Sequence, residues 1–149
     1  MKLLKLIPLL ALVFTLGGCY KETDVAPDLY TSAGEIPQIS VFWAGTARGI
    51  TTVTVDAATT VPITIEYTSA VDVKEIKLYT RATATAAETL LTTIPVGSAT
   101  YDPALRNFVV KANFTAPTAK SASIQVVSEV IATSNLPSAK RAVTVRTRA

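Results

Sequence analysis

The chain has 149 residues, 17% of them charged, and a formal net charge of +3. Two lysines lie in an N-terminal segment that we expect to be cleaved. The mature chain then carries twelve basic and eleven acidic residues, a net charge too small for a general nucleic-acid surface. Histidine is absent and cysteine occurs once, which excludes an internal disulfide, a histidine general base and an ordinary zinc site. The remaining length allows one domain.

The first 18 residues have the three parts of a secretory signal. Two lysines give a positive start, an apolar run follows from Leu6 to Leu16, and small residues precede the expected cleavage point. The run is about eleven residues long and contains Pro8, whereas a bilayer-spanning helix needs about twenty residues. We therefore predict a cleaved signal peptide over residues 1–18 rather than a permanent membrane span.

The sequence Leu16-Gly17-Gly18-Cys19 follows directly and resembles the lipobox of bacterial lipoproteins. In that family a diacylglyceryl thioether forms on the cysteine sulfur, the signal is cleaved before the cysteine, and the new amino group is often acylated. Each buried CH₂ of an acyl chain contributes roughly 0.8 kcal/mol, so two or three chains hold such a protein firmly on a membrane. The resemblance implies that Cys19 is lipidated and anchors the mature protein. An ordinary secreted protein with a chance cysteine is the alternative.

The next residues, Tyr20-Lys21-Glu22-Thr23-Asp24, resemble the surface-export signal of Bacteroidota lipoproteins, although Thr23 interrupts the run of acids that the pattern favours. Aspartate directly after the cysteine, which favours retention in the inner membrane of enteric bacteria, is missing. The resemblance implies a lipid-anchored outer-membrane protein with Lys21 and Glu22 as its export signal. Cell-surface display is expected, and the periplasmic face is the alternative. Residues 19–35 would form a flexible tether because they show little alternation.

From residue 36 onward apolar and polar residues alternate with period two, and valine and threonine are abundant, which predicts strands with one buried face. We expect the charges between the apolar residues, such as Glu66 and Glu75, to be solvated. The predicted strands are centred on Ile39-Val41-Trp43, Val53-Val55, Val61 to Tyr67, Ile76-Leu78, Leu90 to Val96, Phe108 to Phe114, Ile124 to Val130 and Val143-Val145.

Seven or eight short strands separated by turns are typical of two packed antiparallel sheets. From Thr60 onward the arrangement is similar to the immunoglobulin-like and fibronectin type III-like modules of bacterial surface proteins. The similarity is greatest between Val126 and Val145, where the turn 135–138 separates two strands. The predicted fold class is therefore all-β, an immunoglobulin-like β-sandwich over residues 36–149. For residues 82–93 a loop is favoured over a short helix because the segment holds five threonines.

Residue types used in catalysis do not form a recognisable pattern. Without histidine a serine nucleophile needs a lysine partner, yet no Ser-x-x-Lys occurs. The eleven acids are scattered, which favours neither a carboxylate pair for glycoside hydrolysis nor a calcium loop. We predict a protein that is not an enzyme and has no catalytic residues, no metal and no cofactor.

Tyr79 is the aromatic residue most suited to binding. It alternates onto the polar face with Lys77 and Arg81, so its ring could stack on a sugar or on a partner protein. By contrast, Trp43 and Tyr67 are expected to pack in the core. The pattern makes Tyr79 the first ring to test.

The last predicted strand is flanked by the basic residues Lys140, Arg141, Arg146 and Arg148. Such charges can protect a sheet edge from pairing with another sheet. They can also attract an acidic partner, such as lipid headgroups, an anionic polysaccharide or another envelope protein.

Two functional hypotheses follow. The first is an envelope lipoprotein whose sandwich is a non-enzymatic interaction or spacer module. The second is a carbohydrate-binding accessory lipoprotein of a glycan-uptake system. Exposed rings clustered around Tyr79 would favour the second, and scattered rings would favour the first.

Overall fold

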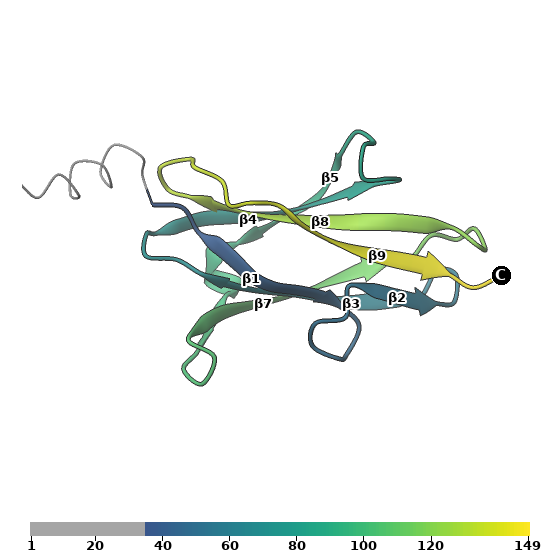
Figure 1. Cartoon of the computed structure of the whole chain (residues 1–149), viewed down its shortest axis with the longest axis horizontal. Coiled ribbons are helices and arrows are strands. Elements are labelled where there is room, and N and C mark those ends of the chain that lie inside the picture. The colour runs from purple at the N-terminus through teal and green to yellow at the C-terminus, as the bar shows by residue number, and fades with distance from the viewer. Residues whose placement is uncertain (1–34) are drawn as a thin grey trace, which may run out of the picture. The chain divides into compact units, whose positions relative to one another are not determined.

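The computed structural model describes residues 35–149, and in this part of the chain nine strands form two packed sheets (Figure 1). The predicted signal, Cys19 and all but the last residue of the predicted tether lie outside the described residues. The strands are β1 (Gln38–Ala44), β2 (Thr52–Val55), β3 (Thr60–Thr68), β4 (Val73–Arg81), β5 (Thr89–Pro95), β6 (Thr100–Asp102), β7 (Asn107–Thr115), β8 (Ser123–Ala132) and β9 (Arg141–Thr147).

One sheet has four strands in the order β1-β3-β7-β6, and the other has five in the order β2-β9-β8-β4-β5. Neighbouring strands are antiparallel, except that β2 runs parallel to β9. The predicted immunoglobulin-like β-sandwich is confirmed. No helix among residues 35–149 has the length and apolar character needed to cross a bilayer.

The core lies between the sheets and follows from the predicted alternation. In β3 the inward residues Ile63, Ile65 and Tyr67 are almost completely buried. They belong to the same apolar cluster as Ile76 and Leu78 of the opposite sheet. Full burial of an aliphatic side chain of this size contributes about 1.5–3 kcal/mol, so these rows hold the sheets together.

In β1 the predicted row of inward residues, Ile39-Val41-Trp43, is wrong. A β-bulge at Ser40 shifts the register between Ile39 and Val41. Because one extra residue reverses the side-chain alternation, Phe42 enters the core cluster in place of the predicted Val41 and Trp43. Trp43 is buried, as predicted, but it lies opposite Thr64 on the outer side of the four-stranded sheet.

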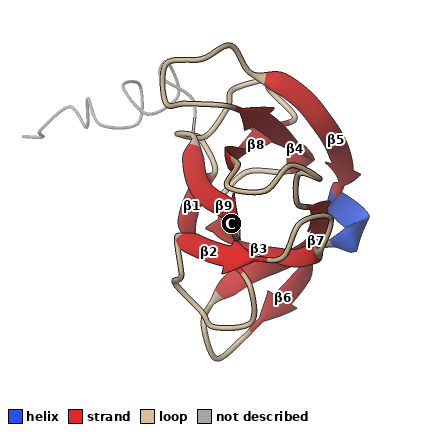
Figure 2. Cartoon of the chain, turned by 90° about the vertical axis from the view of Figure 1, so that its right-hand side faces the viewer, coloured by secondary structure: helices blue, strands red, loops and turns tan. Residues whose placement is uncertain are grey.

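The segment between β4 and β7 differs most from expectation. Residues 82–88 form the predicted loop, but β5 begins at Thr89, so the second half of the 82–93 segment is strand. A one-turn 3₁₀ helix, η2 (Val96–Ser98), then leads to β6, the ninth strand, which the sequence did not indicate. In Figure 2, β5, the blue helix and β6 follow one another along one side of the sandwich.

Candidate functional site

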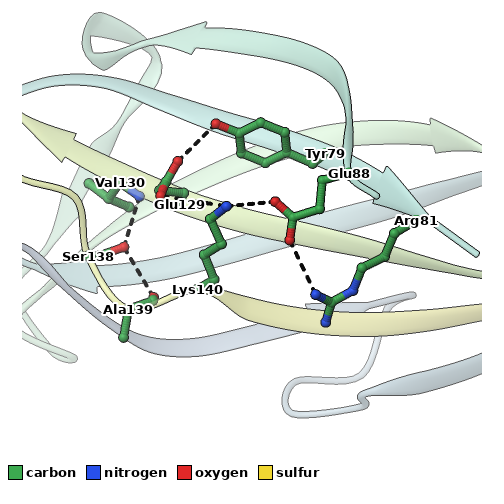
Figure 3. Close-up of polar contacts among 8 residues, drawn as sticks. All are labelled: Tyr79, Arg81, Glu88, Glu129, Val130, Ser138, Ala139 and Lys140. Atoms are coloured by element: carbon green, nitrogen blue, oxygen red, sulfur yellow. Dashed lines mark hydrogen bonds and ion pairs between the residues drawn. The ribbon is translucent and has the colours of Figure 1, made fainter. Parts of the chain in front are cut away.

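The outer side of the five-stranded sheet brings two of the predicted binding residues together. The Tyr79 hydroxyl, on β4, donates a hydrogen bond to Glu129 Oε2 of β8 at 2.9 Å (Figure 3). Lys140 Nζ lies 4.8 Å from the centre of the Tyr79 ring and 2.6 Å from Glu88 Oε2. Glu88 also pairs with Arg81 at 3.2 Å. We call Tyr79, Arg81, Glu88, Glu129 and Lys140 the Tyr79 cluster.

The cluster raises the pKa of two of its members, Tyr79 and Lys140. Burial, followed by the hydrogen bond to Glu129, raises the pKa of Tyr79 to about 12. The phenol is therefore a neutral donor at physiological pH. The hydrogen bond to Glu88 raises the pKa of Lys140, which keeps that ammonium charged. Because Lys140 already lies over the Tyr79 ring, a sugar cannot stack on that side of the ring without displacing it.

The turn before β9 sets the position of Lys140. Asn135 adopts a positive φ of 65° there, a conformation that asparagine tolerates better than most residues. The buried Ser138 hydroxyl accepts a hydrogen bond from the Val130 backbone N–H at 2.9 Å and donates to the Ala139 carbonyl at 3.2 Å. These bonds attach the turn to β8 and place Lys140 beside the Tyr79 ring.

The other predicted basic residues do not join the Tyr79 cluster. Arg148 pairs with Asp56 at 3.4 Å, and both side chains are exposed. Arg141 and Arg146 are exposed and form no ion pair within residues 35–149. Protection of a sheet edge does not explain Arg146, because this part of β9 lies inside its sheet and pairs with both β2 and β8.

A second polar cluster, formed by Arg48, Glu66 and Asn107, lies on the outer side of the four-stranded sheet. The sequence pattern did not predict it. Glu66 was expected to be solvated, but it is only 1% exposed. Arg48, from the β1–β2 loop, donates two hydrogen bonds to its carboxylate at 2.8 and 2.6 Å, and Asn107 donates a third at 3.2 Å. The Arg48 bonds are the main cause that lowers the pKa of Glu66, so the carboxylate stays ionised.

Neither cluster groups three of the common metal ligands. Among residues 35–149 no three carboxylates or other common metal ligands gather. Within residues 35–149 the two tyrosines that are not buried, Tyr79 and Tyr101, belong to different sheets. The Tyr79 cluster instead presents ion-paired charges around the ring of Tyr79.

No family model and no curated protein matches the sequence. Among solved structures, the fold is similar to a Niemann-Pick type C2 protein from the Japanese carpenter ant, with a TM-score of 0.50 and 12% identity over 77% of this chain and 96% of that one. A cellulose-active LPMO in complex with copper has a TM-score of 0.46 and 13% identity, over 63% of this chain and 52% of that one. A family 76 glycoside hydrolase from a bovine Bacteroides thetaiotaomicron strain has a TM-score of 0.43 and 11% identity, over 74% and 20%. At these identities the similarity to the ant protein concerns the fold alone.

Proposed function

We propose that the chain is a lipid-anchored outer-membrane protein whose β-sandwich acts as a non-enzymatic interaction or spacer module at the cell surface. The observation that carries this proposal is the position of the domain relative to the lipobox-like sequence. Strand β1 begins at Gln38, nineteen residues after Cys19. Nineteen residues can reach at most about 65 Å when fully extended, so the spacing leaves enough chain for a folded domain to stand clear of lipid headgroups.

The Tyr79 cluster is the surface that we assign to a protein partner. In the strand register, Leu90 of β5 lies beside Tyr79 and is 53% exposed, whereas Val127 of β8, on the other side, is only 1% exposed. The exposed apolar centre is therefore Leu90 with the Tyr79 ring, and the charged side chains of Arg81, Glu88 and Lys140 lie next to it. An apolar centre with a polar rim is the usual anatomy of a protein–protein interface.

The same surface is less suited to a glycan. Carbohydrate recognition by stacking needs an open ring face, and Lys140 lies over the ring of Tyr79. Tyr101 belongs to the other sheet, so the two rings cannot form one platform. The scattered rings favour the interaction or spacer module over the carbohydrate-binding accessory.

Membrane attachment can be tested with two variants of the lipobox. Cys19→Ser removes the thiol on which cleavage and acylation depend. Gly18→Ala is the matched control, because it keeps a small residue before the cysteine. We expect a fatty-acid analogue to label the wild type and Gly18→Ala in the membrane fraction, and Cys19→Ser to lose label and membrane partitioning together. Equal partitioning of all three, without labelling, would reject the anchor.

A photo-crosslinking residue can distinguish an interaction module from a spacer. We would place it at Leu90, beside Tyr79, and as a control at Lys111, which is exposed on the four-stranded sheet. An interaction module predicts one discrete adduct from position 90 in intact cells and none from position 111. Equal adducts from both positions would argue against a partner at the Tyr79 cluster, and no adduct from either would leave the spacer role.

A further inference from the structure

A hollow of about 480 Å³ lies at the end of the sandwich where β3 ends and β4 begins. Its walls come from both sheets, with Tyr67 and Phe108 on one side and Val73 on the other. The β3–β4 turn and η2 complete the rim. The lining residues are Tyr67, Ser69, Ala70, Val71, Asp72, Val73, Val96 and Phe108. This volume is within the range of small-molecule pockets in proteins.

Tyr67 is the buried polar side chain among the residues that line the hollow. Its side chain is only 1% exposed, yet its hydroxyl forms no hydrogen bond with any residue in the described part of the chain. Burial raises the pKa of Tyr67, so the hydroxyl remains protonated and can donate. The hollow therefore contains a hydrogen-bond donor that the described residues leave unused.

The aromatic wall continues outward from Tyr67. The Tyr67 and Phe108 rings stack with centroids 5.4 Å apart and planes 20° apart. Tyr101 meets Phe108 edge-on, with centroids 5.2 Å apart, and is 51% exposed. Tyr101 does not itself line the hollow, so the aromatic wall consists of the stacked Tyr67 and Phe108 rings. Such a wall favours a ligand with a planar, apolar body.

The charges of the lining residues disfavour anionic ligands. Asp72 is the single acidic side chain of the lining, and it lies in the exposed β3–β4 turn. No cation lines the hollow within the described residues, so an anionic ligand would meet an unfavourable carboxylate and no compensating partner. An uncharged ligand avoids this cost.

We propose that this hollow binds small, uncharged, planar compounds that pack against Phe108 and Val73 and accept a hydrogen bond from the Tyr67 hydroxyl. The site is separate from the Tyr79 cluster, because its lining contains none of that cluster's residues. It therefore does not depend on the interaction or spacer role proposed above.

Binding can be tested with prodan, an uncharged naphthalene ketone whose emission shifts to the blue in apolar sites. The protein would be the soluble form that begins after Cys19, which has neither the apolar segment of residues 6–16 nor a lipid to compete for the probe. We expect saturable binding of one prodan per chain. Val73→Phe fills the hollow and should weaken binding at least tenfold. Val55→Phe is the matched control, since Val55 is also half-buried against the core but does not line the hollow.

Tyr67→Phe tests the hydrogen bond alone, because the ring stays and the hydroxyl is lost. A loss of one neutral hydrogen bond predicts roughly 2- to 10-fold weaker prodan binding. Equal affinity of Tyr67→Phe and the parent would overturn the assigned role of the hydroxyl. Unsaturable binding, or equal affinity of Val73→Phe and Val55→Phe, would overturn the site.

If circular dichroism shows that Val73→Phe does not fold, methyl NMR of the protein without that substitution tests the site instead. Prodan should then shift the methyl resonances of Val71, Val73 and Val96 and leave those of Val53 and Val55 unchanged. Shifts spread evenly over both groups would overturn the proposal.

Discussion

Two buried serines should respond to the same substitution with opposite signs. Ser128 lies in the inward row of β8, is fully buried, and its Oγ has no hydrogen-bond partner among the described residues. Ser138 is 5% exposed, and its Oγ accepts from the Val130 backbone N–H at 2.9 Å. Burying an unpaired hydroxyl costs about 1–3 kcal/mol, whereas losing a partner leaves a buried donor unsatisfied at a similar cost.

Ser128→Ala should therefore stabilise the domain by about 1 kcal/mol, after allowing up to ~1 kcal/mol for the lower strand propensity of alanine. Ser138→Ala should destabilise it by about 1.5 kcal/mol, because the Val130 N–H loses its acceptor. For a domain of this size 1 kcal/mol corresponds to a Tm change of about 4 °C. We expect Ser128→Ala to melt about 4 °C above the wild type and Ser138→Ala about 6 °C below it.

Urea unfolding followed by circular dichroism, on a soluble form that begins after Cys19, measures both variants. The midpoints should move in opposite directions while the m-value stays constant, which identifies a change in stability rather than in the unfolded state. Destabilisation by Ser128→Ala as large as that by Ser138→Ala would show that the Ser128 hydroxyl has a favourable partner, and would refute the reasoning.

Three further predictions concern the two polar clusters and the export signal. Tyr79→Phe should lower the free energy of unfolding by about 1 kcal/mol in urea titrations, because its carboxylate partner loses a hydrogen bond; no loss would mean that the bond is not formed in solution. Glu66 has a lowered pKa in the folded state, so its contribution is present above its ordinary value of 4.5 and is lost as the pH falls through the folded-state pKa. Thermal melts between pH 7 and 3 should show a shallower decline for Glu66→Gln than for the wild type, and parallel curves would contradict the pairing with Arg48. Replacing Lys21 and Glu22 with alanine should keep lipidation but protect the tether from protease added to intact cells; equal cleavage of wild type and double variant would show that these residues do not direct display.

The alternation of apolar residues predicted the sandwich because each strand of the core carries its own signal. The row from Val61 to Tyr67 is buried as expected, since nothing interrupts its register. Alternation predicted the wrong inward residues after Ser40, because a β-bulge there reverses the side-chain alternation. No glycine or proline at this position marks the bulge in the sequence. Strand β6 was missed because three residues are too few to show a period.

The candidate sites were less predictable because their contacts join residues far apart in the chain. Tyr79 and Lys140 were each singled out, but only the strand order places them together. Glu66 looks like any charge on a wet strand face until Arg48 and Asn107, eighteen residues before it and forty-one after it, are seen to cover it. Sequence alternation gives the face on which a residue lies, not the partner that reaches it.

The central claim, that the mature protein is a lipoprotein anchored through Cys19, is tested most directly by mass spectrometry of its N-terminal tryptic peptide from the membrane fraction. The account predicts a peptide that begins at Cys19 and ends at Lys21, with the mass of a diacylglyceryl group on the cysteine and, if the amino group is acylated, of one further acyl chain. A mature protein that begins elsewhere, or a Cys19 peptide with a free thiol, would contradict the claim.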